Sequence, residues 1–297
     1  MKVGIPRGLL YCKYNIFFHS FFEELGAEII TSSTTNKNIL NNGVKLSVDE
    51  ACLPIKIFHG HVSSIKDKCD IILLPRIMQI EKNKYICPKF CGLPEMVINN
   101  IPNMPKTITY PIYYHSKYSL KNWALKAGLN ITKNIPKIFR SYNIAIKNQE
   151  NYDTGINILS SNLNIALLGH PYNVYDNYVN MNIVNILKNL NIGIITEEFV
   201  SEDDKNKYVK ELFKNPFWSF AKNSYGAAAY LGSEHKVDGI IYISSFGCGI
   251  DSIIIDLIKD KLRDFPILIL KIDEQTGQAG FHTRIEAFTD MLERKCI

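Results

Sequence analysis

The chain has 297 residues, a length that predicts about two domains with large buried cores. Its composition, 46% hydrophobic and 21% charged, is that of a folded globular protein and excludes a disordered or fibrous chain. The net charge of +5 is small and dispersed, and no basic tract is interleaved with stacking aromatics, so we expect no nucleic-acid partner.

The sequence gives no sign of export or of a membrane anchor. No run approaches the roughly 18 apolar residues of a membrane span, and the first residues indicate a strand, not a signal peptide. Seven cysteines, an odd number spread along a long chain, do not form a disulfide framework. We therefore expect a cytoplasmic protein with reduced thiols.

Short apolar strands alternate with helices through the first half of the chain. We predict strands at residues 3–6, 27–31, 69–75 and 106–112, helices at 9–25, 53–66, 120–127 and 136–147, and a short helix with a loop in the polar stretch 34–47. The pattern then weakens, and residues 149–162, which include Gly155, form the best linker candidate.

The alternation restarts after the linker. We predict strands at residues 164–168, 193–196, 239–244 and 267–272, and helices at 178–190, 203–213, 218–231, 251–262 and 280–292. Alternating strands and helices of this kind indicate parallel sheets covered on both faces. The predicted fold is α/β, with two tandem doubly wound domains, residues 1–148 and 163–297, and a cleft between them.

Three cysteines fall where such a fold binds ligands, beyond the carboxyl ends of the strands. Cys52 opens a predicted helix, Cys87 lies beyond the strand that ends at Pro75, and Cys248 lies between a strand and a helix. Each alone is more simply explained by packing. Three at corresponding places could converge in the cleft between the domains.

The residues around these cysteines suit a thiolate. Asp49, Glu50 and Pro54 are typical of a helix N-terminus, whose field stabilises negative charge, and the thiolate is the form that binds metal or attacks a substrate. Gly247 and Gly249 clear space beside the Cys248 sulfur.

Thiolates select zinc, copper(I) or iron–sulfur clusters. The chain has no Cys-x-x-Cys pair of the kind structural zinc uses, so three isolated cysteines suit a larger cluster better. Cys91, four residues after Cys87, could reach the same site, whereas Cys12 and Cys69 are expected to be packed.

Histidines and acids give further candidates. His59 and His61 could join Cys52 in a Cys/His zinc site, or could form hydrogen bonds inside the domain. His170 follows a strand, which suits a ligand contact or a capped turn.

Asp273 and Glu274 end the last strand, where they could act as general acid/base groups or could orient Arg284. No phosphate-binding loop, dinucleotide-binding fingerprint or serine nucleophile elbow is present, so the chain shows no nucleotide site of its own and no serine hydrolase site.

Several motifs together resemble a known family, the 2-hydroxyacyl-CoA dehydratase D-component-like proteins, which include acyl-CoA dehydratase activase-related proteins and are akin to double-cubane cluster proteins. The motifs, in order, are Gly-Ile-Pro-Arg-Gly-Leu-Leu from Gly4, Asp-Glu-Ala-Cys-Leu-Pro-Ile-Lys from Asp49, His-Gly-His from His59, Cys-Pro-Lys-Phe from Cys87, Gly-His-Pro-Tyr-Asn from Gly169 and Phe-Gly-Cys-Gly-Ile-Asp-Ser from Phe246.

This resemblance implies tandem flavodoxin-like domains and an iron–sulfur cluster, of the [4Fe-4S] or double-cubane type, held by three cysteines in the cleft. The matching cysteines are Cys52, Cys87 and Cys248. Three thiolates leave a four-iron cluster one protein ligand short. Lys56, Gly247, Gly249 and Ser252 lie in the same motifs and are candidates for binding the cofactor.

The resemblance also implies an ATP-hydrolysing activase as partner, which supplies low-potential electrons for reducing or dehydrating a small-molecule or acyl-CoA substrate within a homo- or heterodimer. Glu50, His170, Asp273 and Glu274 are then the acid/base candidates. The alternatives are a non-catalytic iron–sulfur scaffold or electron carrier, and a zinc-stabilised binding module that uses His59 or His61.

Overall fold

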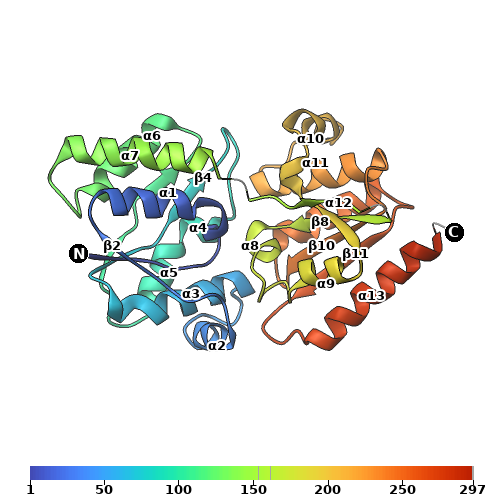
Figure 1. Ribbon diagram of the computed structural model, residues 1–297, viewed down its shortest axis with the longest axis horizontal. Helices are drawn as coiled ribbons and strands as arrows, with labels where there is room; N and C mark the ends of the chain where they lie inside the picture. Colours follow the sequence, from blue (N-terminus) through green and yellow to red (C-terminus); the bar gives the residue numbers. More distant parts are fainter. Residues whose placement is uncertain (153, 161, 296–297) are drawn as a thin grey trace. The chain divides into compact units, whose positions relative to one another are not determined.

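The computed structural model describes residues 1–152, 154–160 and 162–295, and the chain forms two compact units, Met1–Asp153 and Thr154–Ile297 (Figure 1). The division falls within the stretch predicted as a linker. In that stretch the last helix of the first unit continues to Glu150, and a short strand covers Asn157–Ile158.

The first unit is built around a parallel sheet with the strand order β2-β1-β3-β5. Its strands are β1 (Lys2–Ile5), β2 (Glu28–Thr31), β3 (Ile71–Leu73), β4 (Arg76–Gln79), β5 (Lys106–Ile108) and β6 (Pro111–Tyr113). Its helices are α1 (Tyr11–Glu24), α2 (Lys37–Lys45), α3 (Leu53–Ile65), α4 (Pro88–Cys91), α5 (Leu93–Asn100), α6 (Lys117–Gly128) and α7 (Ile135–Glu150), with a 3₁₀ turn at Lys66–Lys68.

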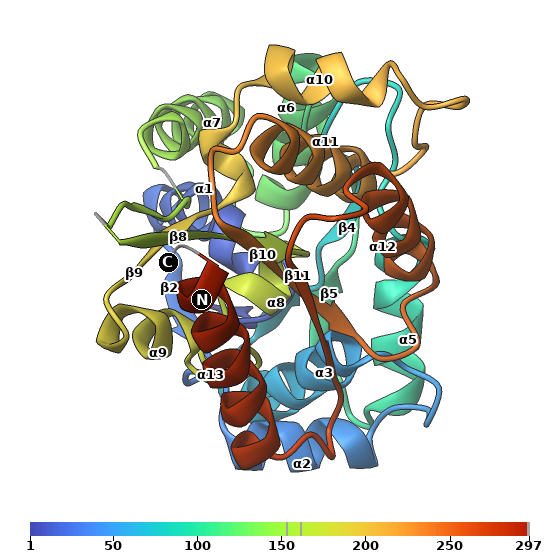
Figure 2. The same ribbon diagram turned by 90° about the vertical axis from the view of Figure 1, so that its right-hand side faces the viewer.

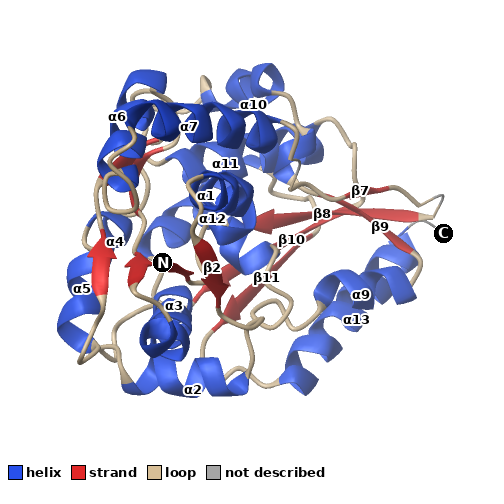
Figure 3. Ribbon diagram, turned by 60° about the vertical axis from the view of Figure 1, so that its left-hand side comes forward, coloured by secondary structure: helices blue, strands red, loops and turns tan. Residues whose placement is uncertain are grey.

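Helices cover both faces of this sheet. In all three views α1, α6 and α7 lie on one face and α2, α3 and α5 on the other (Figures 1 to 3). The strands can therefore be apolar on both sides, and Ile71, Ile72 and Leu73 of β3 are each at most 1% exposed.

The second unit has the strand order β11-β10-β8-β9-β7, in which only β7 is antiparallel to its neighbour. Its strands are β7 (Asn157–Ile158), β8 (Leu163–Gly169), β9 (Ile192–Ile195), β10 (Gly239–Ser245) and β11 (Ile267–Ile272). Its helices are α8 (Pro171–Val174), α9 (Ile183–Asn189), α10 (Glu202–Val209), α11 (Ser219–Ser233), α12 (Gly249–Lys261) and α13 (Gln278–Lys295), with a 3₁₀ turn at Glu197–Phe199.

Both units place their parallel strands in the same order, with the second strand at one side, then the first, third and fourth. This is the order of flavodoxin-like doubly wound sheets. In the second unit α10, α11 and α12 cover one face of the sheet and α9 and α13 the other (Figures 1 and 2). The prediction of two doubly wound α/β domains is confirmed.

One predicted strand, residues 106–112, is wrong in detail, because it divides between two sheets. β5 ends at Ile108 beside β3, and β6 starts at Pro111 beside β4 in a separate two-stranded parallel sheet. Pro75 likewise separates β3 from β4. Proline has no N–H for a strand ladder, so both neighbouring strands break at a proline.

The predicted helix at residues 178–190 begins only at Ile183. Met181 and Asn182 have φ of 50° and 61°, which interrupts a helix. The buried Asn180 holds this turn, because its side chain donates to Val174 O (2.7 Å) and accepts from Asn182 N (2.8 Å).

The helices α2 and α3 cross at two glycines. A Cβ added at Gly43 would lie 1.9 Å from Lys56 O, and one added at Gly60 would lie 1.9 Å from Ile39 O. Only glycine allows so close a backbone approach. The crossing fixes α3, which Cys52 precedes.

Among the described residues, no helix is both long enough and apolar enough to cross a membrane.

Candidate metal centre

The strongest candidate site lies at the carboxyl end of the second sheet, between β8 and β10. The chain reverses its strand order between these two strands, and open α/β sheets bind ligands at such a point. His170 directly follows β8, and Cys248 follows β10 in the turn that leads to α12.

Local sequence fixes both turns. Gly169, which ends β8, has φ of 142°, and a Cβ there would lie 2.3 Å from Ile243 O in β10. His170 is the N-cap residue of α8, and Pro171 begins that helix. Cys248 is the N-cap residue of α12 and follows Gly247, whose φ is 72°.

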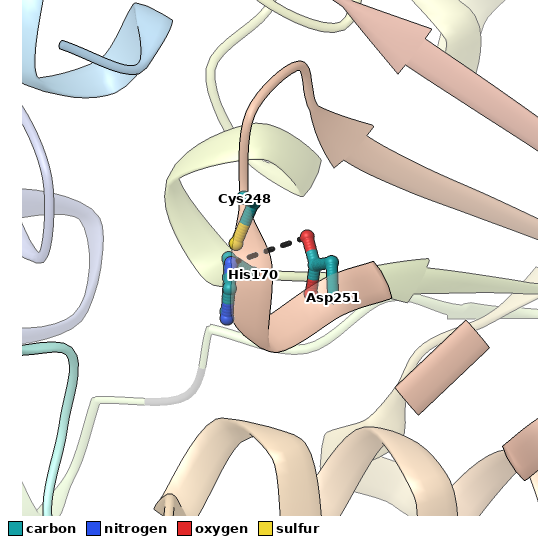
Figure 4. Close-up of side chains that lie close together, drawn as sticks. All are labelled: His170, Cys248 and Asp251. Atoms are coloured by element: carbon teal, nitrogen blue, oxygen red, sulfur yellow. Dashed lines mark ion pairs between the residues drawn. The ribbon is translucent and has the colours of Figure 1, made fainter. Parts of the chain in front are cut away.

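Three side chains meet at this point. One ligand atom each from His170, Cys248 and Asp251 lies within 4.8 Å of the other two, and His170 Nδ1 is 3.5 Å from Asp251 Oδ2 (Figure 4). His170 is 2% exposed and Asp251 1%, while Cys248 is half-buried. Among the described residues this is the only group of three such side chains with metal-ligand spacing.

A buried tyrosine orients the carboxylate. Tyr242 in β10 donates its hydroxyl to Asp251 Oδ1 at 2.9 Å. Burial, and then the neighbouring Asp251 charge, raise the pKa of Tyr242 well above its ordinary value, so this side chain remains a hydrogen-bond donor. Asp251 Oδ2 has no hydrogen-bond partner among the described residues.

The group offers an imidazole nitrogen, a sulfur and a carboxylate oxygen, which together can hold a metal ion. The space beside Cys248 is open, since a Cβ added at Gly247 or Gly249 would meet no atom within 4 Å.

Cys52 and Cys87 lie in the first unit. Each is a half-buried N-cap residue, of α3 and α4 respectively, so all three cysteines of interest begin helices. Within the described part of the first unit, neither belongs to a group of three His, Cys, Asp or Glu side chains with metal-ligand spacing.

Arg76 anchors the segment that follows Cys87. Its guanidinium donates to Cys91 O (2.8 Å) and Thr109 O (3.1 Å) and forms an ion pair with Glu95 of α5. Hydrogen bonding to Arg76 lowers the pKa of Glu95 below its ordinary value.

The acids expected at the start of α3 do not cap it. The N-cap residue is Cys52, no side chain makes a capping hydrogen bond, and Glu50 is exposed. Lys56, one turn into α3, is buried at 3% exposure.

Two of the remaining candidates, Asp273 and Glu274, lie in the turn after β11. Asp273 Oδ1 accepts hydrogen bonds from Thr276 Oγ1 (2.7 Å) and Gln275 N (3.0 Å), so this acid orders the turn after β11. Glu274 is half-buried in the same turn.

Two further side chains bond to backbone carbonyls in the same unit. Arg284 donates to Ile269 O at 2.5 Å. Ser252 donates to Cys248 O at 2.9 Å, within the first turn of α12.

Of the two alternatives predicted for His61, a zinc ligand or a hydrogen-bonded side chain inside the domain, the structure shows hydrogen bonding. The ring nitrogens of His61 bond to Ser32 Oγ (2.9 Å) and Thr35 Oγ1 (3.0 Å). His59 Nδ1 bonds to Ile55 O (2.8 Å), and its Nε2 has no hydrogen-bond partner among the described residues. A zinc ion on His61 would have to displace one of these bonds.

Sequence reasoning identified Cys248 and His170 separately and missed Asp251. A signal for Asp251 was present, because it lies three residues after Cys248 in the first turn of a predicted helix. Residues three apart on a helix lie on one face.

The fold and this group define a tandem doubly wound α/β protein with a candidate metal centre at the strand-order switch of its second unit. The chain belongs to the family described as CoA enzyme activase uncharacterised domain (DUF2229), whose model matches residues 2–200. The matched range contains Cys52, Cys87 and His170 and ends before Cys248. The expected relation to CoA enzyme activase-related proteins is therefore confirmed at the level of the broad family.

Comparisons with curated proteins and with solved structures do not narrow the family further. No curated protein matches the chain. Two solved structures of a periplasmic metal-binding protein from candidatus liberibacter asiaticus, a Mn-bound serine-to-alanine mutant and a metal-free tyrosine-to-phenylalanine mutant, are similar at 10% identity and a TM-score of 0.28. Each alignment covers 99% of both chains.

Proposed function

We propose that the chain is an iron–sulfur protein of the 2-hydroxyacyl-CoA dehydratase D-component-like type, with Cys52, Cys87 and Cys248 as the cluster ligands. The observation that supports this most is the half-buried Cys248 at the strand-order switch, beside open space, in a chain that belongs to a CoA enzyme activase-related family.

The residues fit such a cofactor chemically. All three cysteines are half-buried, and each is the N-cap residue of a helix, so each sulfur lies at the end of an ordered element. Gly247 and Gly249 leave the space beside Cys248 open, and Ser252 and the buried Lys56 remain candidates for contacting the cofactor. A bound cluster of low potential supplies single electrons.

The proposed partner is an ATP-hydrolysing activase that delivers low-potential electrons to this chain in the cytoplasm. The proposed substrate is a small molecule or an acyl-CoA that is reduced or dehydrated, within a homo- or heterodimer. Of the acid/base candidates, His170 is the one placed beside Cys248. Glu50 is exposed, and Asp273 and Glu274 lie in the turn after β11.

Serine variants test the ligand assignment. Cys52→Ser, Cys87→Ser and Cys248→Ser, each purified without oxygen, should lose most of the iron and acid-labile sulfide of the unmodified chain. Cys12→Ser is the matched control, because the Cys12 sulfur lies in α1 and donates to Leu9 O at 3.7 Å. Unchanged iron and sulfide in the three test variants would contradict the proposal.

A second measurement separates an enzyme from an electron carrier. With the activase and ATP, or with dithionite, an enzyme should convert an acyl-CoA or small-molecule substrate. Reduction of the protein without turnover of any substrate would instead favour the non-catalytic carrier.

A further inference from the structure

We propose that the second unit, when Cys248 carries no cluster, binds one zinc ion through His170 Nδ1, Cys248 Sγ and Asp251 Oδ2, with the fourth coordination position open. The site uses residues of one unit only. It goes beyond the proposed function and differs from the zinc alternative at His59 or His61. Because both need the Cys248 thiolate, zinc and the cluster exclude each other in any one chain.

The spacing suits a single ion. Zinc bonds of about 2.0–2.1 Å to nitrogen or oxygen and about 2.3 Å to sulfur put tetrahedral ligand atoms roughly 3.3–3.6 Å apart. His170 Nδ1 and Asp251 Oδ2 are already 3.5 Å apart, and the ligand atoms of all three residues lie within 4.8 Å of one another. Small side-chain movements would complete the coordination.

One of the two carboxylate oxygens of Asp251 is not satisfied by a hydrogen bond from the described residues. Asp251 is 1% exposed, and its Oδ2 has no hydrogen-bond partner among the described residues. The distance of 3.5 Å to His170 Nδ1 is too long for a good hydrogen bond. A cation between these two atoms would satisfy the buried oxygen, and Figure 4 shows both side chains turned toward this position together with the Cys248 sulfur.

The surrounding residues complete a metal site. Tyr242 holds Asp251 Oδ1 through a 2.9 Å hydrogen bond from a central, buried strand, which leaves Oδ2 directed at the ion. On the other side, Cys248 is half-buried, and Gly247 and Gly249 present no side chain. Three protein ligands and one open position are the arrangement of catalytic zinc sites, whereas structural sites have four protein ligands.

The zinc site and the proposed cluster both use the Cys248 thiolate, but only the zinc site uses His170 and Asp251. The cluster also needs Cys52 and Cys87, which the zinc site does not. A full-length chain with Cys52→Ser and Cys87→Ser therefore isolates the zinc site, whether or not the proposed function is correct.

The test is a titration of this metal-free double variant with Co²⁺, a coloured substitute for zinc. We expect one Co²⁺ per chain, displaced by Zn²⁺, with a thiolate-to-cobalt absorption band that Cys248→Ser removes. His170→Gln and Asp251→Asn should each weaken Co²⁺ binding by at least about tenfold, and Tyr242→Phe by about tenfold, a typical effect of losing an outer partner of a ligand. Asp256→Asn, an exposed acid further along α12, is the control and should change nothing.

Circular dichroism of each variant confirms that it is folded before titration. Co²⁺ affinity that is unchanged in folded His170→Gln and Asp251→Asn, or binding without a band that depends on Cys248, would overturn the zinc assignment. Iron and sulfide in the unmodified chain report separately on the proposed function.

Discussion

Acidification should destabilise the first unit through one buried histidine, His61. The side chain is 0% exposed, and both ring nitrogens are hydrogen-bonded. Burial, and then the positive charge of Arg7, lower the pKa of His61 from 6.5 to about 3. The folded chain therefore keeps this ring neutral at pH values where the unfolded chain protonates it.

The direction and size of the effect of pH on stability follow from this difference between the folded and unfolded pKa values. Because the folded pKa lies below the unfolded one, the stability is complete above about pH 6.5 and falls as the pH drops toward the folded pKa. A pH of about 4.5 lies roughly two units below the pKa of this histidine in the unfolded chain. Protonation then stabilises the unfolded chain, relative to the folded one, by about 3 kcal/mol.

Urea unfolding at about pH 7.5 and about pH 4.5 measures this effect. In a Trp218→Phe background, fluorescence reports the first unit, because Trp123 of α6 is then the only tryptophan. Acidification should lower the free energy of unfolding by about 3 kcal/mol more in the chain that keeps His61 than in the His61→Gln variant. His115→Gln, at an exposed position, should behave as the unmodified chain. Equal pH dependence with and without His61 would show that this histidine does not cause the loss of stability in acid.

Two further outcomes concern packing near the candidate cysteines. Gly60→Ala should destabilise the chain by about 1–3 kcal/mol, because the new Cβ would lie 1.9 Å from Ile39 O. The control Gly280→Ala, in an open part of α13, should stabilise the chain by about 0.5–1 kcal/mol. Thermal unfolding measures both variants, and equal effects would contradict the close crossing of α2 and α3. Arg76→Ala should cost about 1–3 kcal/mol and make the chain near Cys91 more sensitive to protease, because two backbone carbonyls lose a charged donor. Unchanged cleavage would show that the anchor is dispensable.

Much of the fold could be predicted because buried parallel strands leave a clear sequence signal. The apolar run at β10 and the helical spacing of Phe281, Ile285, Phe288 and Leu292 are examples, and all four of those side chains are buried. The division of residues 106–112 between two sheets could not be predicted in this way. It depends on which neighbour each half pairs with, and only the prolines give a hint.

The candidate site was predicted in part for a similar reason. Strand ends predict that Cys248 and His170 lie where such folds bind ligands, but their meeting depends on β8 lying beside β10, a long-range pairing. Asp251 was missed because a single acid in a first helical turn usually interacts with the helix dipole. Its buried Oδ2, which accepts no hydrogen bond from the described residues, is visible only in three dimensions.

The proposed function depends on an iron–sulfur cluster held by Cys52, Cys87 and Cys248. The most direct test is iron, zinc and acid-labile sulfide analysis, with Mössbauer spectra, of the unmodified chain purified without oxygen. We expect iron and sulfide in comparable amounts and the spectrum of a cluster with thiolate ligands. A chain that contains no sulfide, and either zinc or no metal at all, would contradict the proposed cluster.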